Sequence, residues 1–223
     1  MLMLSEAITK DQIDVVFDGM EPVSSDRDSL AAAATGIITL AFASDPVARW
    51  TYPDPDQYLE HFPEFVRAFA GKSFSEGTAY LAPDGGGAAL WLGPGIQPNE
   101  DELLGLVWSS MSDEVQRDLF PLFEQMAAFH PNEPHWYLPM IGVEPSRQGS
   151  GVGSALLQHT LATCDADGLP AYLESTNPKN IPLYERFGFE QIGVIRSGGA
   201  PPMFPMIRRP QRAWDEDIFK TNT

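Results

Sequence analysis

The feature that most constrains this chain is a glycine-rich loop between an apolar run and an amphipathic helix. Gly149, Gly151 and Gly153 stand directly before a helical pattern that ends at Gly168. Glycine removes side chains from such a loop, so backbone N–H groups can converge on an anion where the helix dipole is positive. The sequence therefore predicts a strand, a phosphate-binding turn and a helix in succession. A tight turn that needs glycine only for its backbone geometry is the alternative.

Hydrophobic periodicity and turn residues divide the rest of the chain into elements. Apolar residues at spacings of three and four predict amphipathic helices, and short apolar runs bounded by glycine or proline predict strands. We expect residues 1–28 to form an N-terminal arm and residues 29–223 to form one α/β domain with a mixed sheet. The expected helices cover 29–42, 58–69, 101–110, 113–129, 151–167 and 181–187, and the expected strands cover 78–81, 88–92, 135–143, 171–175, 189–195 and 203–208.

The charge balance argues against one class of partner. The 31 acidic residues against 14 Lys and Arg give a formal net charge of −17, which repels a phosphate backbone over most of the surface. We therefore expect no nucleic-acid partner, whereas a cationic small molecule or peptide would be attracted; a strongly acidic surface that only keeps the protein in solution is the alternative. No apolar run reaches the roughly 20 residues of a membrane span, and residues 1–4 lack the basic flank of a secretory signal. We expect a cytoplasmic protein with no membrane partner, either a monomer or a homodimer.

Cysteine usage limits redox and metal chemistry. Cys164 is the single cysteine of the chain, so no internal disulfide framework and no thiol cluster for structural zinc can form. It lies on the apolar side of the expected helix over 151–167, which predicts a buried and unreactive thiol. We expect no bound metal.

A dinucleotide-binding loop is the first functional rival for the glycine segment. Glu174 follows the loop by about 20 residues at a strand end, where a ribose-binding acid would stand. The fit is incomplete, because the position where that fingerprint requires its third glycine is occupied by Ser154. In addition, too little chain follows to complete such a sheet. The Walker pattern fails as well, since no lysine follows the glycines.

The segment from Trp136 to Gly193 resembles the cofactor-binding half of the GNAT acetyltransferases. Their signature places Gln or Arg three residues before a Gly, which is followed two positions later by Gly or Ala. Downstream, members often carry an Asn after the next strand, a Tyr seven residues later and then a Gly-Phe pair. The matching residues here are Gln148, Gly151, Gly153, Asn177, Tyr184, Gly188 and Phe189. Within the family, parts of this segment are similar to the puromycin N-acetyltransferases.

The resemblance implies a mostly antiparallel central sheet with helices on both faces and a splayed parallel strand pair at the cofactor site. It implies acetyl coenzyme A as co-substrate, with the acceptor side in 29–134 and the cofactor side in 135–209. The pantetheine arm would pair with a strand edge, and the pyrophosphate would lie on the glycine loop. The implied cofactor residues are Met140, Ile141, Gly142, Val143, Gln148, Gly149, Ser150, Gly151, Val152, Gly153, Ser154 and Asn177.

Pro139 fits this arrangement, because proline in a sheet is usually placed at an edge or bulge. The strand should then part from 171–175 where the arm enters, unless Pro139 merely ends a short strand. Asn177 would hold the pantetheine or the start of the last helix, although an Asn before Pro178 is equally a turn residue.

Acetyl transfer to an amine needs a neutral nucleophile, donors for the oxyanion and an acid for the leaving thiolate. Tyr184 matches the family's general acid, and backbone N–H groups near Ile141 would be the oxyanion donors. Glu174 and His135 are candidate bases. Some family members use a water chain in place of a side-chain base, and a strand-end carboxylate such as Glu174 is more often solvated or salt-bridged than catalytic.

The acceptor is expected to be a primary amine of a small molecule. Trp50, Tyr52 and Trp136 are candidates for the walls of its pocket, although aromatic residues at such spacings are more often core. Two other functions remain open: a non-catalytic coenzyme A sensor on the same fold, and an acetyltransferase for peptide or protein amines.

Overall fold

The computed structural model describes residues 27–211, so the expected arm at 1–28 lies outside it apart from its last two residues. The helices are α2 (Arg27–Ala41), α3 (Pro46–Thr51), α4 (Pro55–Ala70), α5 (Lys72–Glu76), α6 (Glu100–Ser110), α7 (Asp113–Phe129), α8 (Val152–Asp167) and α9 (Ile181–Arg186), with short 3-10 turns η1 (Pro145–Arg147) and η2 (Pro178–Asn180). The strands are β1 (Ala79–Leu81), β2 (Gly87–Leu92), β3 (Trp136–Val143), β4 (Ala171–Ser175), β5 (Glu190–Gln191) and β6 (Phe204–Arg208).

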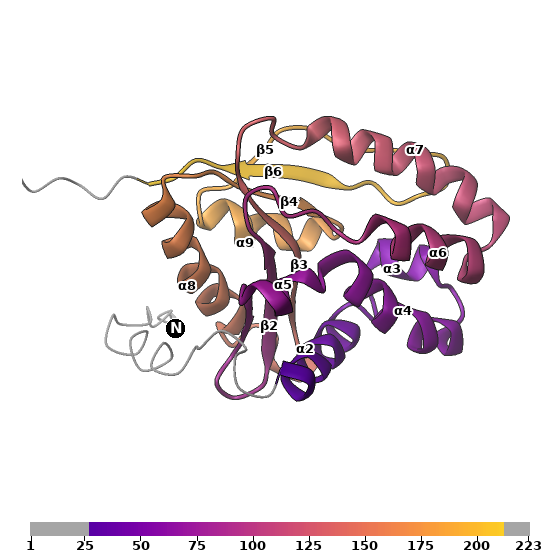
Figure 1. Ribbon diagram of the computed structural model, residues 1–223, viewed down its shortest axis with the longest axis horizontal. Coiled ribbons are helices and arrows are strands. Elements are labelled where there is room, and N and C mark those ends of the chain that lie inside the picture. The colour runs from indigo at the N-terminus through magenta and orange to yellow at the C-terminus, as the bar shows by residue number, and fades with distance from the viewer. Residues whose placement is uncertain (1–26, 212–223) are drawn as a thin grey trace, which may run out of the picture.

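The six strands form one sheet in the order β1-β2-β3-β4-β6-β5 (Figure 1). Neighbouring strands are antiparallel except for β3 and β4, which are parallel. The expected mixed, mostly antiparallel sheet with one parallel pair is confirmed.

The parallel pair separates soon after it begins. β3 and β4 pair through Trp136 with Ala171 and through Tyr137 with Tyr172, and β3 then runs six residues further without this partner. The register of β3 against β2 shifts between Leu90 and Leu92, where the single residue Trp91 of β2 lies opposite Leu138 and Pro139 of β3. This is a β-bulge at Pro139, the residue that has no N–H to give to a ladder. The prediction that Pro139 marks the parting of the strands is confirmed.

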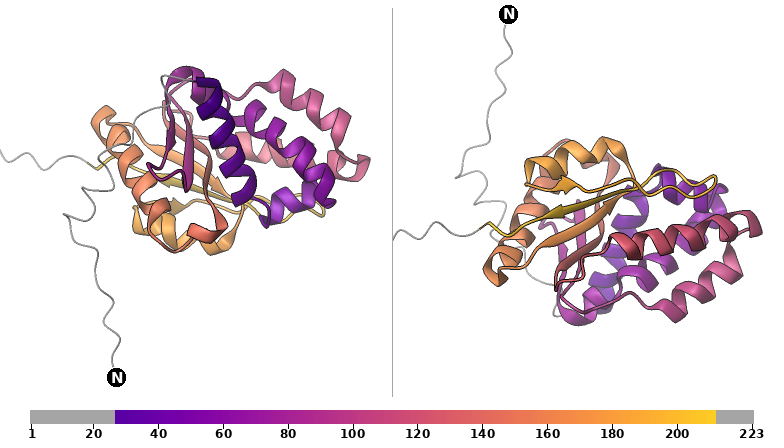
Figure 2. Two further views of the ribbon diagram at one scale, coloured as in Figure 1. Left: turned by 90° about the horizontal axis from the view of Figure 1, so that it is seen from below. Right: turned by 90° about the horizontal axis from the view of Figure 1, so that it is seen from above.

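Helices cover both faces of the sheet (Figure 2). On one face α2 and α4 pack against β2 and β3, and residues of α6 and α7 join the same apolar cluster as Ala88, Leu90 and Met140. On the other face α8 and α9 pack against Trp91 and Leu138. Because of the bulge, Leu138 and Met140 point to opposite faces although they are two residues apart.

Asp and Pro define the starts of two helices in a segment where the sequence predicted only a break. Asp45 caps α3 by accepting the N–H groups of Val47 and Ala48 at 3.0 and 3.1 Å. Asp54 caps α4 in the same way. A proline at the first helical position has no N–H to leave unsatisfied, so Pro46 and Pro55 begin helices here. The helix α3 was not expected from the sequence, because Pro46 indicates a break in the chain as readily as the start of a helix.

The strand expected over 189–195 is shorter in the structure. β5 contains two residues, and a single bridge joins Ile195 to Met203. Between them the backbone of Gly193 passes so close to the ring of Phe129 that a Cβ there would lie 2.4 Å from it. Ile192 still donates its N–H to the Pro205 carbonyl at 2.9 Å, so the ladder is interrupted where Gly193 packs against the end of α7.

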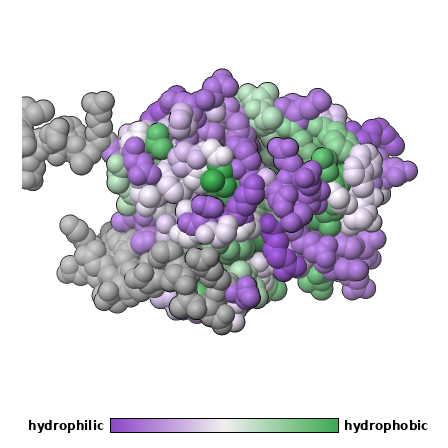
Figure 3. Space-filling model, viewed as in Figure 1, coloured by the Kyte–Doolittle hydropathy of each residue, from purple (hydrophilic) through white to green (hydrophobic). Residues whose placement is uncertain are grey.

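Hydrophilic side chains cover much of the face shown in Figure 3, with hydrophobic ones between them. Cys164 is buried against the sheet, and burial raises the pKa of its thiol to about 12. Within residues 27–211, no helix is both long enough and apolar enough to cross a membrane, and no cluster of His, Cys, Asp or Glu side chains is suited to a metal ion.

Candidate active site

Two pockets meet at the point where β3 and β4 separate. The larger, which we call the donor cleft, has a volume of about 650 Å³ and runs from this point to the glycine loop. The smaller, which we call the acceptor chamber, has a volume of about 70 Å³ and lies among α3, α4, α7 and the sheet. The residues that line both pockets are Phe42, Asp45, Pro139, Glu174 and Thr176.

The glycine loop forms one end of the donor cleft. Gly149 and Gly151 have φ of 78° and 94°, a left-handed conformation that other residues rarely adopt. Gly151 precedes the first turn of α8 without any side-chain cap, and the first intrahelical bond runs from the Ala155 N–H to the Gly151 carbonyl. The N–H groups of Val152, Gly153 and Ser154 therefore face the cleft at the positive end of a 16-residue helix.

A negatively charged molecule fits this end of the cleft. A Cβ added to Gly153 would meet only ordinary contacts, the nearest at 3.5 Å, so packing within the chain does not require glycine there. The backbone is instead left open for close approach by another molecule. Arg147, Lys179 and Arg186 line the same cleft, which gives it basic groups although the whole chain carries a charge of −17. The Arg147 guanidinium is paired with Asp84, and the two carboxylates of the cleft, Asp45 and Glu174, are residues shared with the acceptor chamber.

The other expected cofactor residues lie around the cleft with distinct local roles. Ile141, Gly142 and Val143 line it, whereas the Met140 side chain lines the acceptor chamber. The Gln148 amide donates to the Val143 carbonyl at 3.2 Å and so ties the loop to β3. Asn177 accepts the Lys179 N–H at 3.1 Å and caps η2, while it also lines the cleft.

Tyr184 lies on α9 and lines the donor cleft, with 6% of its surface exposed. Its ring packs edge-on against Phe189, with centroids 6.0 Å apart. Burial, and to a lesser extent the negative charge of Asp45, raise the pKa of the phenol above its usual value of 10. The hydroxyl is therefore protonated at neutral pH and can act as a hydrogen-bond donor.

Glu174 connects both pockets to a pair of histidines. Its carboxylate is nearly fully buried, and its Oε1 lies 3.2 Å from Nε2 of His130, the C-cap residue that follows α7. His130 Nδ1 lies 3.3 Å from Nε2 of His135, and His135 Nδ1 lies 2.8 Å from the Glu133 carbonyl. The two candidate bases, Glu174 and His135, are thus joined by a histidine that the sequence analysis did not identify. His135 itself lines neither pocket.

The positions of the protons on the two histidines can be worked out from the Glu133 carbonyl, at which the series of contacts ends. The Glu133 carbonyl can only accept, so His135 Nδ1 carries a hydrogen, and burial lowers the pKa of His135 and favours its neutral form. His135 Nε2 is then an acceptor, His130 Nδ1 donates to it, and His130 Nε2 faces Glu174. Two lone pairs would oppose each other at that point unless a proton lies between them. Glu174 is thus placed next to the one ring nitrogen of the histidine pair that has no other partner in this series.

The three aromatic residues proposed for the acceptor pocket are not together. Tyr52 lines the acceptor chamber, and its hydroxyl lies 2.8 Å from the Ser110 hydroxyl. Trp136 donates from its indole to Asp167 at 2.9 Å, and Trp50 packs against the core near Gly199. Neither tryptophan lines either pocket.

Asp45 and Thr176 are two further residues that line both pockets, and they were not among the residues expected from the sequence. The Thr176 hydroxyl donates to Asp45 Oδ2 at 2.6 Å, which joins the start of α3 to the end of β4. Their positions in the sequence are 131 residues apart, so no local pattern brings them together. The Asp-Pro pair at 45–46 is a helix-start signal that would have placed Asp45.

Comparison with known proteins places this geometry in a family. A family model described as the acetyltransferase (GNAT) family matches residues 47–189. An uncharacterized N-acetyltransferase of Schizosaccharomyces pombe is 29% identical over 204 residues, which covers 83% of this chain and 81% of the relative.

Solved structures share the fold. A crystal structure from Corynebacterium glutamicum, described as histone acetyltransferase HPA2 and related acetyltransferase, has 26% identity and a TM-score of 0.58, covering 86% of this chain and 96% of the other. Arylalkylamine N-acetyltransferase 2 from Aedes aegypti has a TM-score of 0.59 at 12% identity, covering 86% and 99%. At that identity the second likeness shows the fold alone.

Proposed function

The chain belongs to the GNAT family of acetyltransferases, and from this membership and the two pockets we propose that it transfers acetyl from acetyl coenzyme A to the primary amine of a small molecule. As a family member it is an acyltransferase. The fold family uses acetyl coenzyme A and acts on amine acceptors. The donor side is proposed to be 135–209 and the acceptor side 29–134, both within one domain over 29–223.

The observation that carries the proposal is the junction of the two pockets. Glu174 and Thr176 line both the basic cleft and the apolar chamber. A donor in the cleft and an acceptor in the chamber can therefore react directly, without an acetylated side chain between them. No cysteine lines either pocket, because Cys164, the single cysteine of the chain, is buried on the side of α8 that packs against the sheet.

Residues of the donor cleft would hold acetyl coenzyme A by its charged and amide groups. The N–H groups at the start of α8, with Arg147, Lys179 and Arg186 nearby, would bind the phosphates. The edge of β3 beyond Tyr137 is left unpaired by β4 and would pair with the pantetheine amides. The same edge near Ile141 would supply N–H donors to the oxyanion.

Glu174 is the proposed base. The amine enters as an ammonium and loses one proton to Glu174. His130 and His135 then pass this proton toward solvent. The neutral nitrogen attacks the thioester carbonyl, a C–N bond forms and the C–S bond breaks. Tyr184 gives its proton to the leaving sulfur, and the second proton that leaves the nitrogen restores the Tyr184 phenol, so one proton in total is released.

Acetyl transfer is tested with the purified chain, acetyl coenzyme A and a panel of primary amines that includes puromycin and a lysine peptide. The proposal expects free thiol and acetylated amine in equal amounts with at least one small amine. Tight binding of coenzyme A without thiol release for any acceptor would instead indicate a non-catalytic sensor. Turnover of the lysine peptide alone would indicate a peptide or protein acetyltransferase.

A further inference from the structure

We infer that the acceptor is a compact primary amine with an apolar body and one positive charge, bound in the acceptor chamber with its nitrogen at Glu174. This rests on the proposed acetyl transfer and adds the class of amine. Three properties of the chamber carry it: its lining, its charge and its capacity to change shape.

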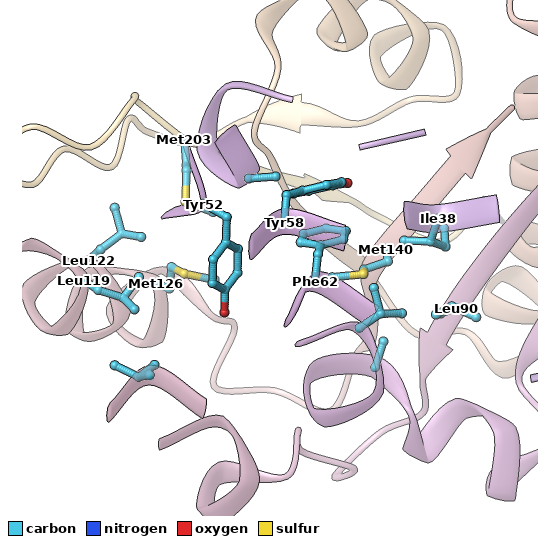
Figure 4. Packing of buried hydrophobic residues seen from close by; sticks show 14 of the residues in the cluster. Ile38, Tyr52, Tyr58, Phe62, Leu90, Leu119, Leu122, Met126, Met140 and Met203 are labelled. Carbon is cyan, nitrogen blue, oxygen red and sulfur yellow. The ribbon is translucent and has the colours of Figure 1, made fainter. Parts of the chain in front are cut away.

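The lining of the chamber is almost entirely apolar. Figure 4 shows Leu119, Leu122 and Met126 of α7 directed toward Tyr52 and Met203, which come from distant parts of the chain. The remaining apolar or aromatic lining residues are Phe42, Val47, Ala48, Phe62, Phe65, Phe69, Met111, Phe123, Tyr137, Pro139 and Met140. The body of the acceptor must therefore be apolar, because nothing along most of this surface would replace the water lost by a polar body.

Charge fixes which end of the acceptor lies at the junction. The charged residues of the lining are Asp45 and Glu174, with no lysine or arginine. Asp45 already accepts two backbone N–H groups on one oxygen and the Thr176 hydroxyl on the other. Glu174 forms an ion pair with His130, and after burial its carboxylate is the next cause that raises the pKa values of the Tyr137 and Tyr172 phenols, which therefore lie close to it. Asp45 is occupied by helix capping, so Glu174 is the carboxylate placed to receive an ammonium. The amine then lies where the chamber opens to the donor cleft.

A second charge on the acceptor would lie deep in the chamber. A chain extending from Glu174 toward α7 would place a distal ammonium among Leu122, Phe123 and Met126, without an anion. Burying an unpaired ammonium is far more costly than burying a methyl group. Diamines, polyamines and lysine side chains that carry a peptide backbone should therefore bind much more weakly than an apolar monoamine of the same length.

The chamber can enlarge to admit such a body. Its volume of about 70 Å³ is below the roughly 150 Å³ of an apolar cavity that takes benzene. Four methionines line it, at 111, 126, 140 and 203. Methionine side chains are unbranched and repack readily, so an alkyl chain or a single aromatic ring can enter when they shift.

The test compares hexylamine, phenethylamine, the diamine with a second amine at the far end of the hexyl chain, and a lysine peptide. We expect kcat/KM for hexylamine and phenethylamine to exceed that of the diamine and the peptide by at least about 100-fold. Equal or better turnover of the diamine or the peptide would overturn the inferred class while leaving acetyl transfer intact. Absence of thiol release with every amine would instead overturn the proposed function itself.

Chamber variants locate the binding site independently. Leu122→Phe should reduce the ratio of hexylamine to ethylamine turnover at least tenfold, and Met126→Ala should shift the preference toward octylamine. Leu59→Phe makes the same substitution on the exposed side of α4, where Leu59 is 60% exposed, and should leave the profile unchanged. Calorimetric binding of coenzyme A verifies that each variant is folded. An unaltered chain-length profile in folded Leu122→Phe and Met126→Ala would show that the amine binds elsewhere.

Discussion

Tyr184 is the residue whose proposed role depends on a single oxygen atom. Tyr184→Phe removes that oxygen and keeps the ring packed against Phe189. We expect kcat to fall by about 100-fold or more, because the leaving thiolate loses its proton donor, while the affinity for acetyl coenzyme A changes less than about twofold. Since the pKa of this phenol is raised, its ionisation should not lower the wild-type rate up to about pH 10. Thiol release and calorimetry measure these quantities.

Tyr80→Phe is the matched control, because Tyr80 lies on β1 against His159 and lines neither pocket. It should retain the wild-type rate. A Tyr184→Phe enzyme that is equally active would remove Tyr184 from the chemistry.

Glu174 and His130 should control the acidic side of the pH profile. The wild-type rate should rise with pH and reach a plateau, since the base must be unprotonated to accept from the amine. Glu174→Gln should lower kcat by at least about 100-fold, and its remaining rate should keep rising with pH because the amine must then lose its proton to solvent. His130→Gln should show an intermediate loss, and His159→Gln on α8 serves as the histidine control. Unchanged pH profiles in the Glu174 and His130 variants would exclude this proton path.

Residues of the candidate site differ in how far the sequence could predict them. Tyr184 and the glycines of the loop stand at fixed spacings in one continuous segment, so their placement on one cleft could be predicted. His130 joins the site only because the end of α7 packs beside β4, and Thr176 meets Asp45 across 131 residues. Such contacts depend on tertiary packing, which leaves no local spacing to recognise.

A partly buried ion pair joins α8 to β6 on the cofactor side of the domain. Arg208 of β6 donates twice to Asp165 of α8, at 2.7 and 2.8 Å, and its Nε donates to the Phe187 carbonyl after α9. Burial opposes ionisation of Asp165, but the hydrogen bonds from Arg208 and Gln211 and the Arg208 charge outweigh it, so its pKa is lowered. This link holds α9, and with it Tyr184, against the sheet.

Asp165→Asn should reduce the free energy of unfolding by about 2 to 3 kcal/mol, because a largely buried arginine loses its partner while Asp165 is partly exposed. A lowered carboxyl pKa stabilises the fold above the ordinary value near 3.8 and loses this effect as pH falls. The difference between wild type and variant should therefore shrink below about pH 4. Urea denaturation at several pH values measures it.

Glu133→Gln is the control, since it breaks the exposed pair with Arg209 and should cost less than about 1 kcal/mol. An equal loss of stability in both variants would contradict the importance given to burial.

The elements themselves could be predicted well where their pattern is local. The strand over 171–175 has the expected bounds, and the hairpin of β1 and β2 follows from two apolar runs around a glycine turn. The helix α3 could not be predicted from the rule that proline breaks helices, because Pro46 stands at its first helical position, and β5 is shorter than expected where Gly193 packs against Phe129. The bulge at Pro139 could be predicted from proline chemistry alone, but its effect on which face Met140 occupies could not.

At the scale of the whole molecule, the net charge is strongly negative, whereas the donor cleft is lined by basic residues. The chain carries a net charge of −17, yet Arg147, Lys179 and Arg186 gather at one cleft. Acetyl coenzyme A at about 100 times its dissociation constant should stabilise the fold by roughly 2.7 kcal/mol and raise Tm by roughly 5 to 10 °C. The shift should diminish with salt, because screening weakens the phosphate contacts. Thermal unfolding followed by circular dichroism measures it.

NAD and NADP should leave Tm unchanged, which separates the donor cleft from a dinucleotide site. The double variant Lys179→Ala with Arg186→Ala should reduce the shift given by acetyl coenzyme A, while Lys72→Ala on α5 should not. A larger shift with NAD than with acetyl coenzyme A would contradict the assignment of the cleft.

The central claim is that donor and acceptor occupy adjoining pockets at the same time and react directly. Initial rates of thiol release, with acetyl coenzyme A and hexylamine varied together, test it most directly; the buried Cys164 thiol should contribute no background signal. The account predicts reciprocal plots that intersect, and thiol release that depends on the amine. Parallel plots with formation of an acetylated protein, or thiol release at the same rate without amine, would contradict it.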